Sequence, residues 1–424
     1  MIYVILLFVL ICWVAFTTYE DIKIHGVLSF SILARLLFVV IYVVSGLCHL
    51  IFTNNFYRGF FDVSLARVDY NPIVILSLYI SYYFLRYGQS VSFRVRNFNL
   101  QRVVPDSYWL YSLLFLLIGF FASYKLASSI DVSTIERARE LPPGVAKFIF
   151  LSQWFIWGVT MFFIRVSDCF DDKDSPMLMA IFGLCVFLIA ASLAWTGGRS
   201  IVVLLTLPLF WLYSRLSLRN FSIATIISSV AFLLYVVVVT SIRKEGYSIE
   251  STNLSEILDW EFGRYSMVAF SFDFLSQDGY LWGATYLDAM LRVVMVPIYF
   301  MGIGADFLGS LDGATVSYVG KFILGDSSKT YIVPGALSEA IMNFGLFGAV
   351  FIPFFLGVVL RFVDDLIRNA AGDKFLIVFY SYLGAVLTLN YLSGTFLSAL
   401  NYIFYTGLPL IFLFIIHALL SRGR

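Results

Sequence analysis

Apolar segments of about twenty residues recur along the whole chain, and this feature constrains the fold more than any other. A helix needs about 20 mostly apolar residues to cross the hydrocarbon core of a bilayer. Strands of a membrane barrel would instead alternate apolar and polar residues, and these segments do not alternate. We therefore predict an all-α, polytopic integral membrane protein with about 11 transmembrane helices, at roughly 1–16, 27–52, 71–86, 107–128, 147–164, 177–196, 200–216, 221–242, 336–361, 375–392 and 395–420.

The composition excludes several other classes of protein. Charged residues make up 13% of the 424 residues and hydrophobic residues 60%, whereas soluble domains average about 25% and 45–50%. Such a chain cannot cover a surface that faces water, so a soluble enzyme and a disordered chain are excluded. The 28 Lys and Arg residues are balanced by 27 Asp and Glu residues. This balance also excludes a nucleic-acid partner, which would require a basic excess.

Basic residues between the segments predict the orientation, because Lys and Arg near helix ends stay on the cytoplasmic side. The strongest marker is the connection that holds Arg86, Arg94, Arg96 and Arg102. Placing this connection inside puts three more basic clusters inside, namely Arg215 with Arg219, Arg361 with Arg368 and Lys374, and Arg422 with Arg424. The N-terminus is then outside and the C-terminus inside.

This topology divides the chain into three regions. Residues 1–242 hold about eight spans, residues 243–335 form one large loop outside the cytoplasm, and residues 336–424 hold about three spans. The loop is the only extramembrane stretch long enough to build a site. We see no second soluble domain.

The large loop is expected to contain interfacial helices. Asn253 followed by Glu256 resembles a capping box, which predicts a helix from Leu254 to about Leu275 with its apolar residues along the bilayer surface. The apolar stretch Tyr286–Met301 is interrupted by two charges and a proline. This stretch predicts a short re-entrant or interfacial helix.

Several arginines lie on the outer side of the predicted topology, against the sorting rule. They are Arg199, in the short turn Thr196–Ser200, and Arg243, Arg264 and Arg292, in or beside the large loop. A guanidinium offers a planar fork that suits phosphate oxygens, so together they predict a site for the diphosphate of a lipid-linked substrate. The alternative is that each snorkels to lipid phosphates or pairs with a carboxylate, namely Glu245, Glu261 or Asp288.

A carboxylate joins these arginines at the start of a predicted span. Pro334 and Gly335 open the segment, and Glu339 and Asn343 follow on one helical face because they are four residues apart. An ionisable residue inside a span is a functional candidate by default. The alternative is a structural carboxylate stabilised by the helix dipole.

Cofactor and metal sites are not indicated. The four cysteines and three histidines are dispersed, without metal-ligand or disulfide spacing: Cys12, Cys48, Cys169, Cys185, His25, His49 and His417. The chain has no Gly-x-x-x-x-Gly-Lys motif for nucleotide phosphates. We expect no metal and no cofactor.

The turn around Arg199, Arg243 at the mouth of the large loop, and Pro334-Gly335 followed by Glu339, Asn343 and Gly345 together resemble bacterial O-antigen and oligosaccharide repeat-unit polymerases of the Wzy type. The resemblance covers about residues 190–350. It implies a metal-independent glycosyltransferase of the bacterial inner membrane, with its site facing the periplasm. The implied partners are undecaprenyl-diphosphate-linked oligosaccharides, membrane lipids and a chain-length regulator protein.

The residues then suggest roles in glycan transfer. Arg199, Arg243 and Arg264 or Arg292 are expected to bind the departing diphosphate, where preorganised cations lower the barrier. Glu339 is expected to orient or deprotonate the acceptor hydroxyl, with Asn343 positioning Glu339 or a sugar. Glu245 and Glu261 are alternative candidates for the base.

Two alternatives of different kinds stay open. An O-antigen ligase has a similar hydropathy pattern, but ligases typically carry an important His in the large loop, and this loop has none. A flippase or transporter of lipid-linked oligosaccharide also buries charges in its spans, usually near the bilayer midplane. Here the candidate charges gather at the outer boundary, which favours the enzyme.

Overall fold

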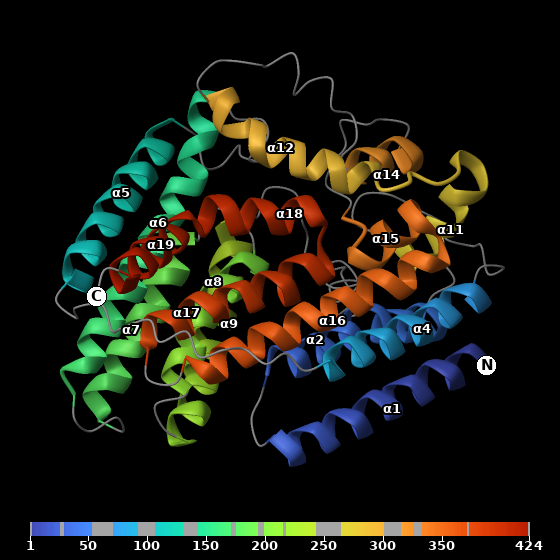
Figure 1. Ribbon diagram of the computed structural model, residues 1–424, viewed down its shortest axis with the longest axis horizontal. Helices are drawn as coiled ribbons and strands as arrows, with labels where there is room; N and C mark the ends of the chain where they lie inside the picture. Colours follow the sequence, from blue (N-terminus) through green and yellow to red (C-terminus); the bar gives the residue numbers. More distant parts are fainter. Residues whose placement is uncertain are drawn as a thin grey trace. The chain divides into compact units, whose positions relative to one another are not determined.

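The computed structural model describes twelve ranges: residues 2–25, 29–52, 71–91, 107–129, 143–170, 175–193, 199–214, 218–242, 264–300, 315–324, 333–370 and 373–422. Within these ranges every regular element is helical, so the predicted all-α class is confirmed (Figure 1). Contacts divide the chain into two compact units. Unit 1 comprises Met1–Arg94, Ser248–Asp365 and Val386–Leu400, and unit 2 comprises Val95–Tyr247, Leu366–Ala385 and Asn401–Arg424.

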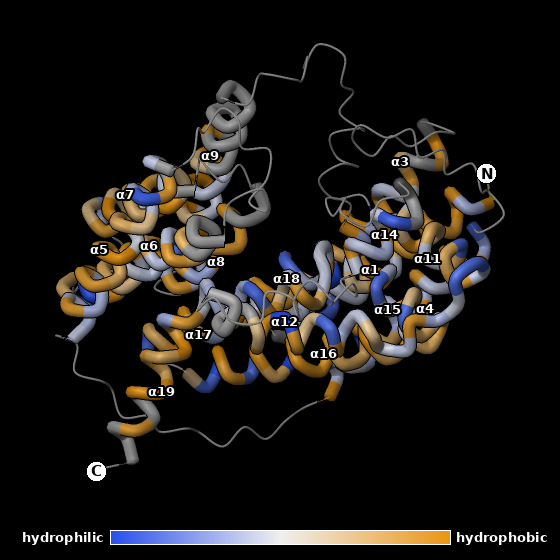
Figure 2. The backbone as a smooth tube through the Cα atoms, turned by 90° about the horizontal axis from the view of Figure 1, so that it is seen from above, coloured by the Kyte–Doolittle hydropathy of each residue, from blue (hydrophilic) through white to orange (hydrophobic). Residues whose placement is uncertain are grey.

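The helices confirm a membrane-embedded protein. Among the described residues, six helices are long and apolar enough to cross a bilayer: Ile2–Lys23, Phe30–Cys48, Ser107–Leu126, Phe148–Asp168, Leu346–Asn369 and Lys374–Tyr391. A pair bent by 54°, Phe396–Thr406 with Leu408–Ile416, makes a seventh if it is one span. The first of these segments lies in α1 (Ile2–His25), and hydrophobic residues run along much of α16 (Leu346–Asn369) in Figure 2.

The other predicted spans are helices as well, but they do not meet the same test. They are α4 (Asn71–Ser90), α7 (Pro176–Leu193), α8 (Arg199–Ser214) and α9 (Leu218–Ile242). In α7, α8 and α9 the apolar stretches that the structure describes have only 10–17 residues. The count of about 11 spans therefore stays a prediction.

One predicted span is divided in two. Residues 336–361 were expected to form one helix, but α15 (Ala336–Phe344) ends at Gly345, which has φ 60° and ψ −142°. The membrane-length helix α16 begins only at Leu346. Glu339 therefore lies in a separate short helix that precedes the span, rather than inside it.

At one end of unit 1, a carboxylate of α16 holds the start of α2 (Phe30–Phe38). The Asp364 side chain accepts hydrogen bonds from the backbone N–H groups of Phe30 (2.8 Å) and Ser31 (3.0 Å), and from the Ser31 hydroxyl (2.6 Å). The first N–H groups of a helix have no partner within the helix. A buried carboxylate that accepts from them also interacts favourably with the helix dipole.

A buried arginine joins α1 and α4 to this same end. Arg35 of α2 forms an ion pair with Asp21 of α1, and its Nε donates to Oε1 of Gln89 on α4 (2.5 Å). The Gln89 amide in turn donates to the backbone oxygen of Ser31 (3.0 Å). We call this region the Asp364 end of unit 1, where α1, α2, α4 and α16 meet.

The opposite end of unit 1 holds α15. From Leu346 to Asp364 the α16 helix rises about 27 Å at about 1.5 Å per residue, so α15 and the Asp364 end lie at opposite ends of that helix. The π-helical segment η1 (Val39–Val44) continues α2 away from the Asp364 end, and α3 (Ser45–Phe52) follows it.

A helix of the large loop packs against α15. This helix, α11 (Tyr265–Asp278), begins at Tyr265, with Arg264 as its N-cap residue. Met267, Phe270 and Phe274 are buried in a cluster with Met342 of α15. These apolar residues pack inside unit 1, not along a bilayer surface as predicted. The predicted capping residues Asn253 and Glu256 lie outside the described residues.

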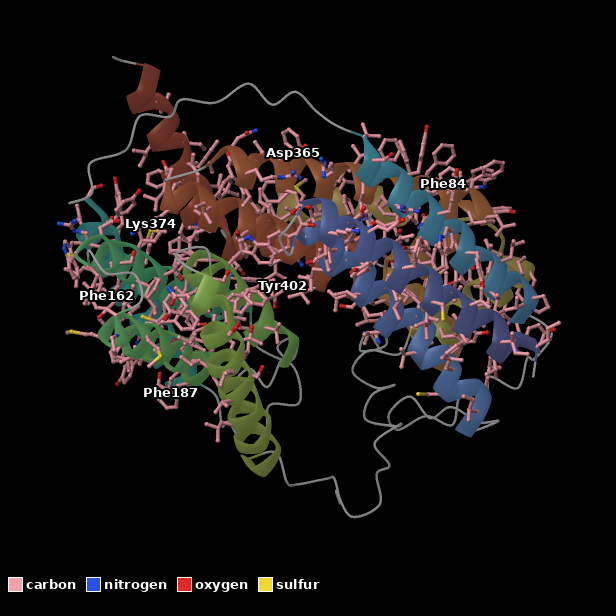
Figure 3. All side chains as sticks on the ribbon, turned by 90° about the horizontal axis from the view of Figure 1, so that it is seen from below. Phe84, Phe162, Phe187, Asp365, Lys374 and Tyr402 are labelled. Atoms are coloured by element: carbon pink, nitrogen blue, oxygen red, sulfur yellow. The ribbon has the colours of Figure 1, made fainter. Side chains whose placement is uncertain are left out.

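Unit 2 is built around α5 (Ser107–Ser129) and α6 (Pro143–Asp168), which approach closely at two glycines. A Cβ at Gly119 would collide with the backbone of Phe155, and one at Gly158 would collide with Leu116. Small residues allow this close packing in membrane helices. Lys374, at the start of α17 (Lys374–Ala385), donates to the Ser167 hydroxyl (2.7 Å) and pairs with Asp168 (Figure 3).

Candidate functional site

The candidate site is centred on Glu339 in the first turn of α15. The preceding Gly335 has φ 85° and ψ 157°, a conformation that is open essentially only to glycine. A Cβ at Gly335 would lie 2.8 Å from the Tyr42 hydroxyl and 3.3 Å from Cγ of Arg264. The Pro334-Gly335 start of the helix is confirmed, and it brings the backbone against two polar side chains.

The Glu339 carboxylate is fully buried, and both of its oxygens accept hydrogen bonds. The Thr315 hydroxyl of α14 (Thr315–Leu324) donates to Oε1. The backbone N–H of Phe396, the first residue of α18 (Phe396–Asn401), donates to Oε2 at 2.8 Å. One side chain of α15 therefore connects this helix to both α14 and α18.

Burial raises the pKa of Glu339 to about 7, while hydrogen bonds from Thr315, Phe396 and Thr285 oppose the rise. Removing a carboxylate from water disfavours its charged form, and donors aimed at its oxygens favour it. A carboxyl group with a pKa near 7 can both hold and release a proton at neutral pH. That property is what a general base requires.

Asn343 connects the carboxylate to the next helix. Its Nδ2 donates to the Thr285 hydroxyl (2.8 Å) and to the backbone oxygen of Glu339 (2.8 Å), and its Oδ1 accepts from the backbone N–H of Gly283 (3.0 Å). Thr285 itself hydrogen-bonds Glu339. The geometry therefore fits the expectation that Asn343 positions Glu339, with Thr285 as the intermediary.

Arg264 lies beside Gly335, at the start of α15. Its side chain is buried against Gly335, and its Nε donates to the backbone oxygen of Ser393 (2.9 Å). The charges of both Arg264 and Glu339 act on the hydroxyl of Tyr42. A guanidinium, a phenol and a carboxylate are thus neighbours at this end of unit 1.

Two π-helical segments shape this neighbourhood. In η1 the backbone oxygen of Ile41 accepts from the backbone N–H of Arg264 (3.0 Å), and the Tyr42 hydroxyl donates to the backbone oxygen of Leu392 (2.9 Å). Leu392 directly follows the second segment, η5 (Val386–Tyr391). Single π-helical turns occur frequently at functional sites, because they interrupt regular helix geometry.

The remaining predicted arginines are placed differently. Arg292 of α12 (Ala284–Phe300) donates through Nε to Asp288 at 2.8 Å, so it is paired, as the alternative interpretation predicted. Arg199 begins α8 in unit 2, but its side chain lies outside the described residues. Arg243, Glu245 and Glu261 also lie outside them. Of the four predicted arginines, Arg264 is the one whose described side chain lies at the start of α15, against Gly335.

Sequence reasoning did not identify Tyr42, Thr285, Thr315 or the N-terminus of α18. Tyr42 and Phe396 are hundreds of residues apart along the chain, and both reach α15. A tyrosine, a threonine or a backbone N–H in a membrane protein carries no local signal of such a role. Within the described ranges, no three His, Cys, Asp or Glu side chains are grouped closely enough to hold a metal ion.

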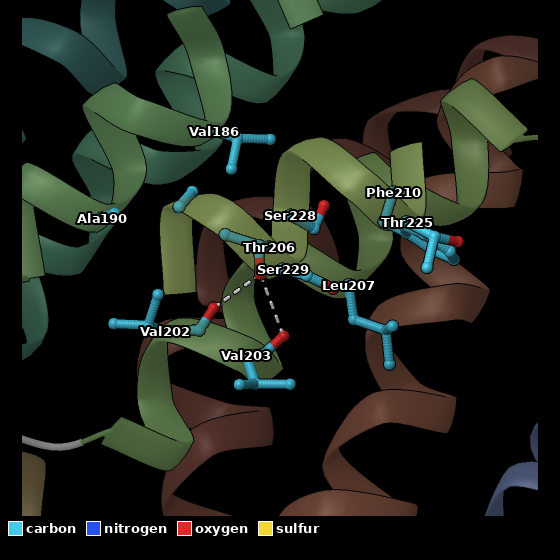
Figure 4. Close-up of a pocket in the computed structure, with 11 residues that line it drawn as sticks. Val186, Ala190, Val202, Val203, Thr206, Leu207, Phe210, Thr225, Ser228 and Ser229 are labelled. Atoms are coloured by element: carbon cyan, nitrogen blue, oxygen red, sulfur yellow. Dashed lines mark hydrogen bonds between the residues drawn. The ribbon is translucent and has the colours of Figure 1, made fainter. Parts of the chain in front are cut away.

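Unit 2 contains a cavity of about 240 Å³ between α7, α8 and α9 (Figure 4). The Thr206 hydroxyl at this cavity donates to the backbone oxygens of Val202 (2.7 Å) and Val203 (3.2 Å), so it is already paired. None of the lining residues is ionisable. Among the described residues that line it, the cavity therefore offers no acid, base or cation for a reaction.

Searches against protein-family models, curated proteins and solved structures find no match to this chain.

Proposed function

We propose that this protein is a membrane glycosyltransferase that polymerises lipid-linked oligosaccharide repeat units. The single observation that carries the proposal is the buried Glu339 carboxylate, with a pKa near 7, on the short helix α15, at whose start the Arg264 side chain lies against Gly335. A carboxylate can accept the proton of a sugar hydroxyl, and a guanidinium can stabilise a departing diphosphate. The Wzy-type resemblance of the sequence supports the same reaction.

The distribution of charge in unit 1 supports a site on the periplasmic face of a bacterial inner membrane. Basic residues of α2, α4 and α16 gather toward the Asp364 end, namely Arg35, Arg86 and Arg361. Glu339 lies toward the opposite end of α16. Because basic helix ends stay in the cytoplasm, the proposed topology puts the Asp364 end inside and Glu339 outside.

The proposed reaction joins two lipid-linked glycans. The acceptor sugar hydroxyl attacks the anomeric carbon of the donor, and the bond from that carbon to the diphosphate oxygen breaks. Glu339 takes the hydroxyl proton, and the undecaprenyl diphosphate departs with the electron pair of the broken bond. Arg264 stabilises the negative charge that grows on this diphosphate. The roles of Arg199 and Arg243 in holding the diphosphate stay predictions.

Thr285 and Asn343 have positioning roles in this proposal. Their hydrogen bonds hold α15 and the Glu339 carboxylate in one orientation, and no substrate contact is assigned to them. The role of Arg292 in holding the diphosphate also stays a prediction, and its Nε donates to Asp288. Undecaprenyl-linked oligosaccharides are the proposed substrates, with a chain-length regulator as a further partner.

A transporter of lipid-linked oligosaccharide is the second candidate, and one observation favours it. Glu339 lies where the N-terminus of α18 meets the short helix α15, and transporters often build their sites from such helix breaks. Transporter sites usually lie near the midplane of the bilayer, whereas α15 lies at the end of α16. We therefore prefer the enzyme.

Deletion of the gene in the native strain distinguishes these functions. The surface polysaccharide is extracted and separated by gel electrophoresis. A polymerase predicts loss of the long-chain ladder while a single repeat unit stays attached. Loss of the single repeat as well would support the ligase or the transporter, and an unchanged ladder would refute all three.

A further inference from the structure

The α12 helix has its polarity inverted relative to a helix at a water-exposed protein surface. Its outward face carries four large apolar side chains that are 36–67% exposed: Leu287, Met290, Leu291 and Val294. Its inward face carries Thr285 and Asp288, which are buried. Exposing contiguous apolar surface to water is unfavourable, by about 25 cal/mol for each Å².

The charges of α12 follow the same inverted pattern. Arg292 reaches back one turn to Asp288, and this ion pair lies toward the protein, with the Asp288 side chain only 7% exposed. In water these two groups would gain hydration by facing outward. With hydrocarbon outside, both the apolar outward face and the inward ion pair are favourable.

The start of α12 is attached to the residues that precede the membrane-length helix α16, whose exposed face is also apolar. The backbone N–H groups of Leu281 and Trp282 donate to the backbone oxygens of Met342 and Asn343, both at 3.1 Å. These bonds attach the start of α12 to the residues just before α16. The exposed face of α16 begins there with large aromatic side chains, namely Phe347, Phe351 and Phe355.

Two exposed aromatic residues mark the junction. Tyr280 is 50% exposed and Trp282 is 77% exposed. Trp282 has φ 50°, an uncommon conformation for a residue other than glycine, while its N–H bond to Asn343 holds the turn in place. Trp and Tyr are enriched at the boundary between the lipid headgroups and the acyl chains.

We infer that α12 lies in the lipid–water interface of the membrane, with Leu287, Met290, Leu291 and Val294 against the acyl chains and Trp282 at the headgroups. This inference does not depend on the proposed function. Helices with one apolar face lie in the plane of the interface in this way. Because Thr285 on the inward face contacts Glu339, α12 then separates the lipid from the candidate site.

Spin labelling tests the inference. Leu287→Cys, Leu291→Cys and Val294→Cys are made singly in a chain whose four native cysteines are replaced, and each is labelled with a nitroxide after reconstitution into vesicles of phosphatidylcholine and phosphatidylglycerol. Oxygen concentrates in the hydrocarbon and a charged nickel chelate stays in water. The control is Lys321→Cys, an exposed position on α14.

All three α12 labels are expected to collide mainly with oxygen, and the Lys321→Cys label mainly with the nickel chelate. Collision of the α12 labels with the chelate to the extent of the control would overturn the inference, because the face would then be in water. Low collision with both reagents would also overturn it, because the face would then be covered by protein. Three positions keep the test valid if one variant does not fold.

Discussion

The backbone N–H of Phe396 donates to the Glu339 carboxylate at 2.8 Å, so a side chain of α15 accepts a hydrogen bond from the first N–H group of α18. The bond joins α15 to α18 across 57 residues of sequence. It gives Glu339 a structural role in addition to the proposed chemical one. The experiments below separate the two roles.

The stability of the protein is expected to depend on pH through Glu339. In the folded chain the Glu339 carboxyl stays protonated up to about pH 7, because its pKa is raised from the ordinary value of 4.5. Between these values the folded state binds more protons than the unfolded state, so the contribution of Glu339 to the free energy of unfolding falls as the pH rises. Thermal unfolding in detergent, from about pH 4.5 to about pH 8, measures this fall.

Glu339→Gln serves as the comparison in that experiment, because the amide does not titrate. The difference in unfolding temperature between the wild type and the variant should shrink as the pH rises through this window. A difference that stays constant with pH would contradict the raised pKa.

Gly335→Ala is expected to destabilise the fold by about 1–3 kcal/mol, which is the cost of holding a non-glycine residue in this sparsely populated backbone region. Crowding of the new Cβ by the Tyr42 hydroxyl at 2.8 Å adds to this cost. Gly183→Ala is the control, because the nearest atoms to a Cβ there lie at 3.8 Å. Thermal unfolding should show a clear drop for Gly335→Ala and none for Gly183→Ala; equal effects would refute the argument.

Asp364→Ala should also destabilise the protein, by about 3 kcal/mol or more, because buried N–H groups lose a charged acceptor. Asp365→Ala is the neighbouring control; Asp365 is labelled in Figure 3, and its Oδ2 lies 3.5 Å from Nε of Arg361. We expect Asp365→Ala to cost less than half as much. Denaturation midpoints of the purified proteins measure both effects, and a neutral Asp364→Ala would show that the cap of α2 is dispensable.

Arg199→Lys and Arg243→Lys test whether diphosphate binding needs the guanidinium fork. Lys keeps the charge but cannot make the paired hydrogen bonds of Arg. We expect a turnover reduced by about tenfold or more for a bidentate contact, since a hydrogen bond to a charged group contributes about 1.5–3 kcal/mol. Polymerase assays on membranes with matched protein levels measure this, and wild-type turnover in both variants would remove these residues from the site.

The sequence predicted the helical class, because hydropathy is a strong local signal. Pro334-Gly335 correctly predicted where α15 begins, and the four-residue spacing correctly placed Glu339 and Asn343 on one buried helix. The break at Gly345 was missed, since the apolar pattern continues through it. Its reason is tertiary, because Tyr280 packs where a Cβ would lie.

The partners of Glu339 could not be predicted for a related reason. Thr315, Phe396 and Tyr42 reach α15 only after distant helices pack together. The π-helical segments η1 and η5 likewise lack a residue pattern that distinguishes them from the α-helices they interrupt. The partner of Arg292 could be predicted, because Asp288 lies only one helical turn away and was already named as an alternative.

The central claim is that the Glu339 carboxylate acts as the base in glycan polymerisation. The direct measurement complements the deletion strain with the gene for Glu339→Gln or, as a control, for Glu20→Gln. Glu20 is a partly exposed carboxylate at the Asp364 end. The long-chain ladder of each strain is quantified at equal membrane levels of protein. A general base contributes about 10²–10⁴-fold to turnover, so Glu339→Gln should abolish the ladder while Glu20→Gln retains it. A full ladder from a normally expressed Glu339→Gln protein would contradict the claim.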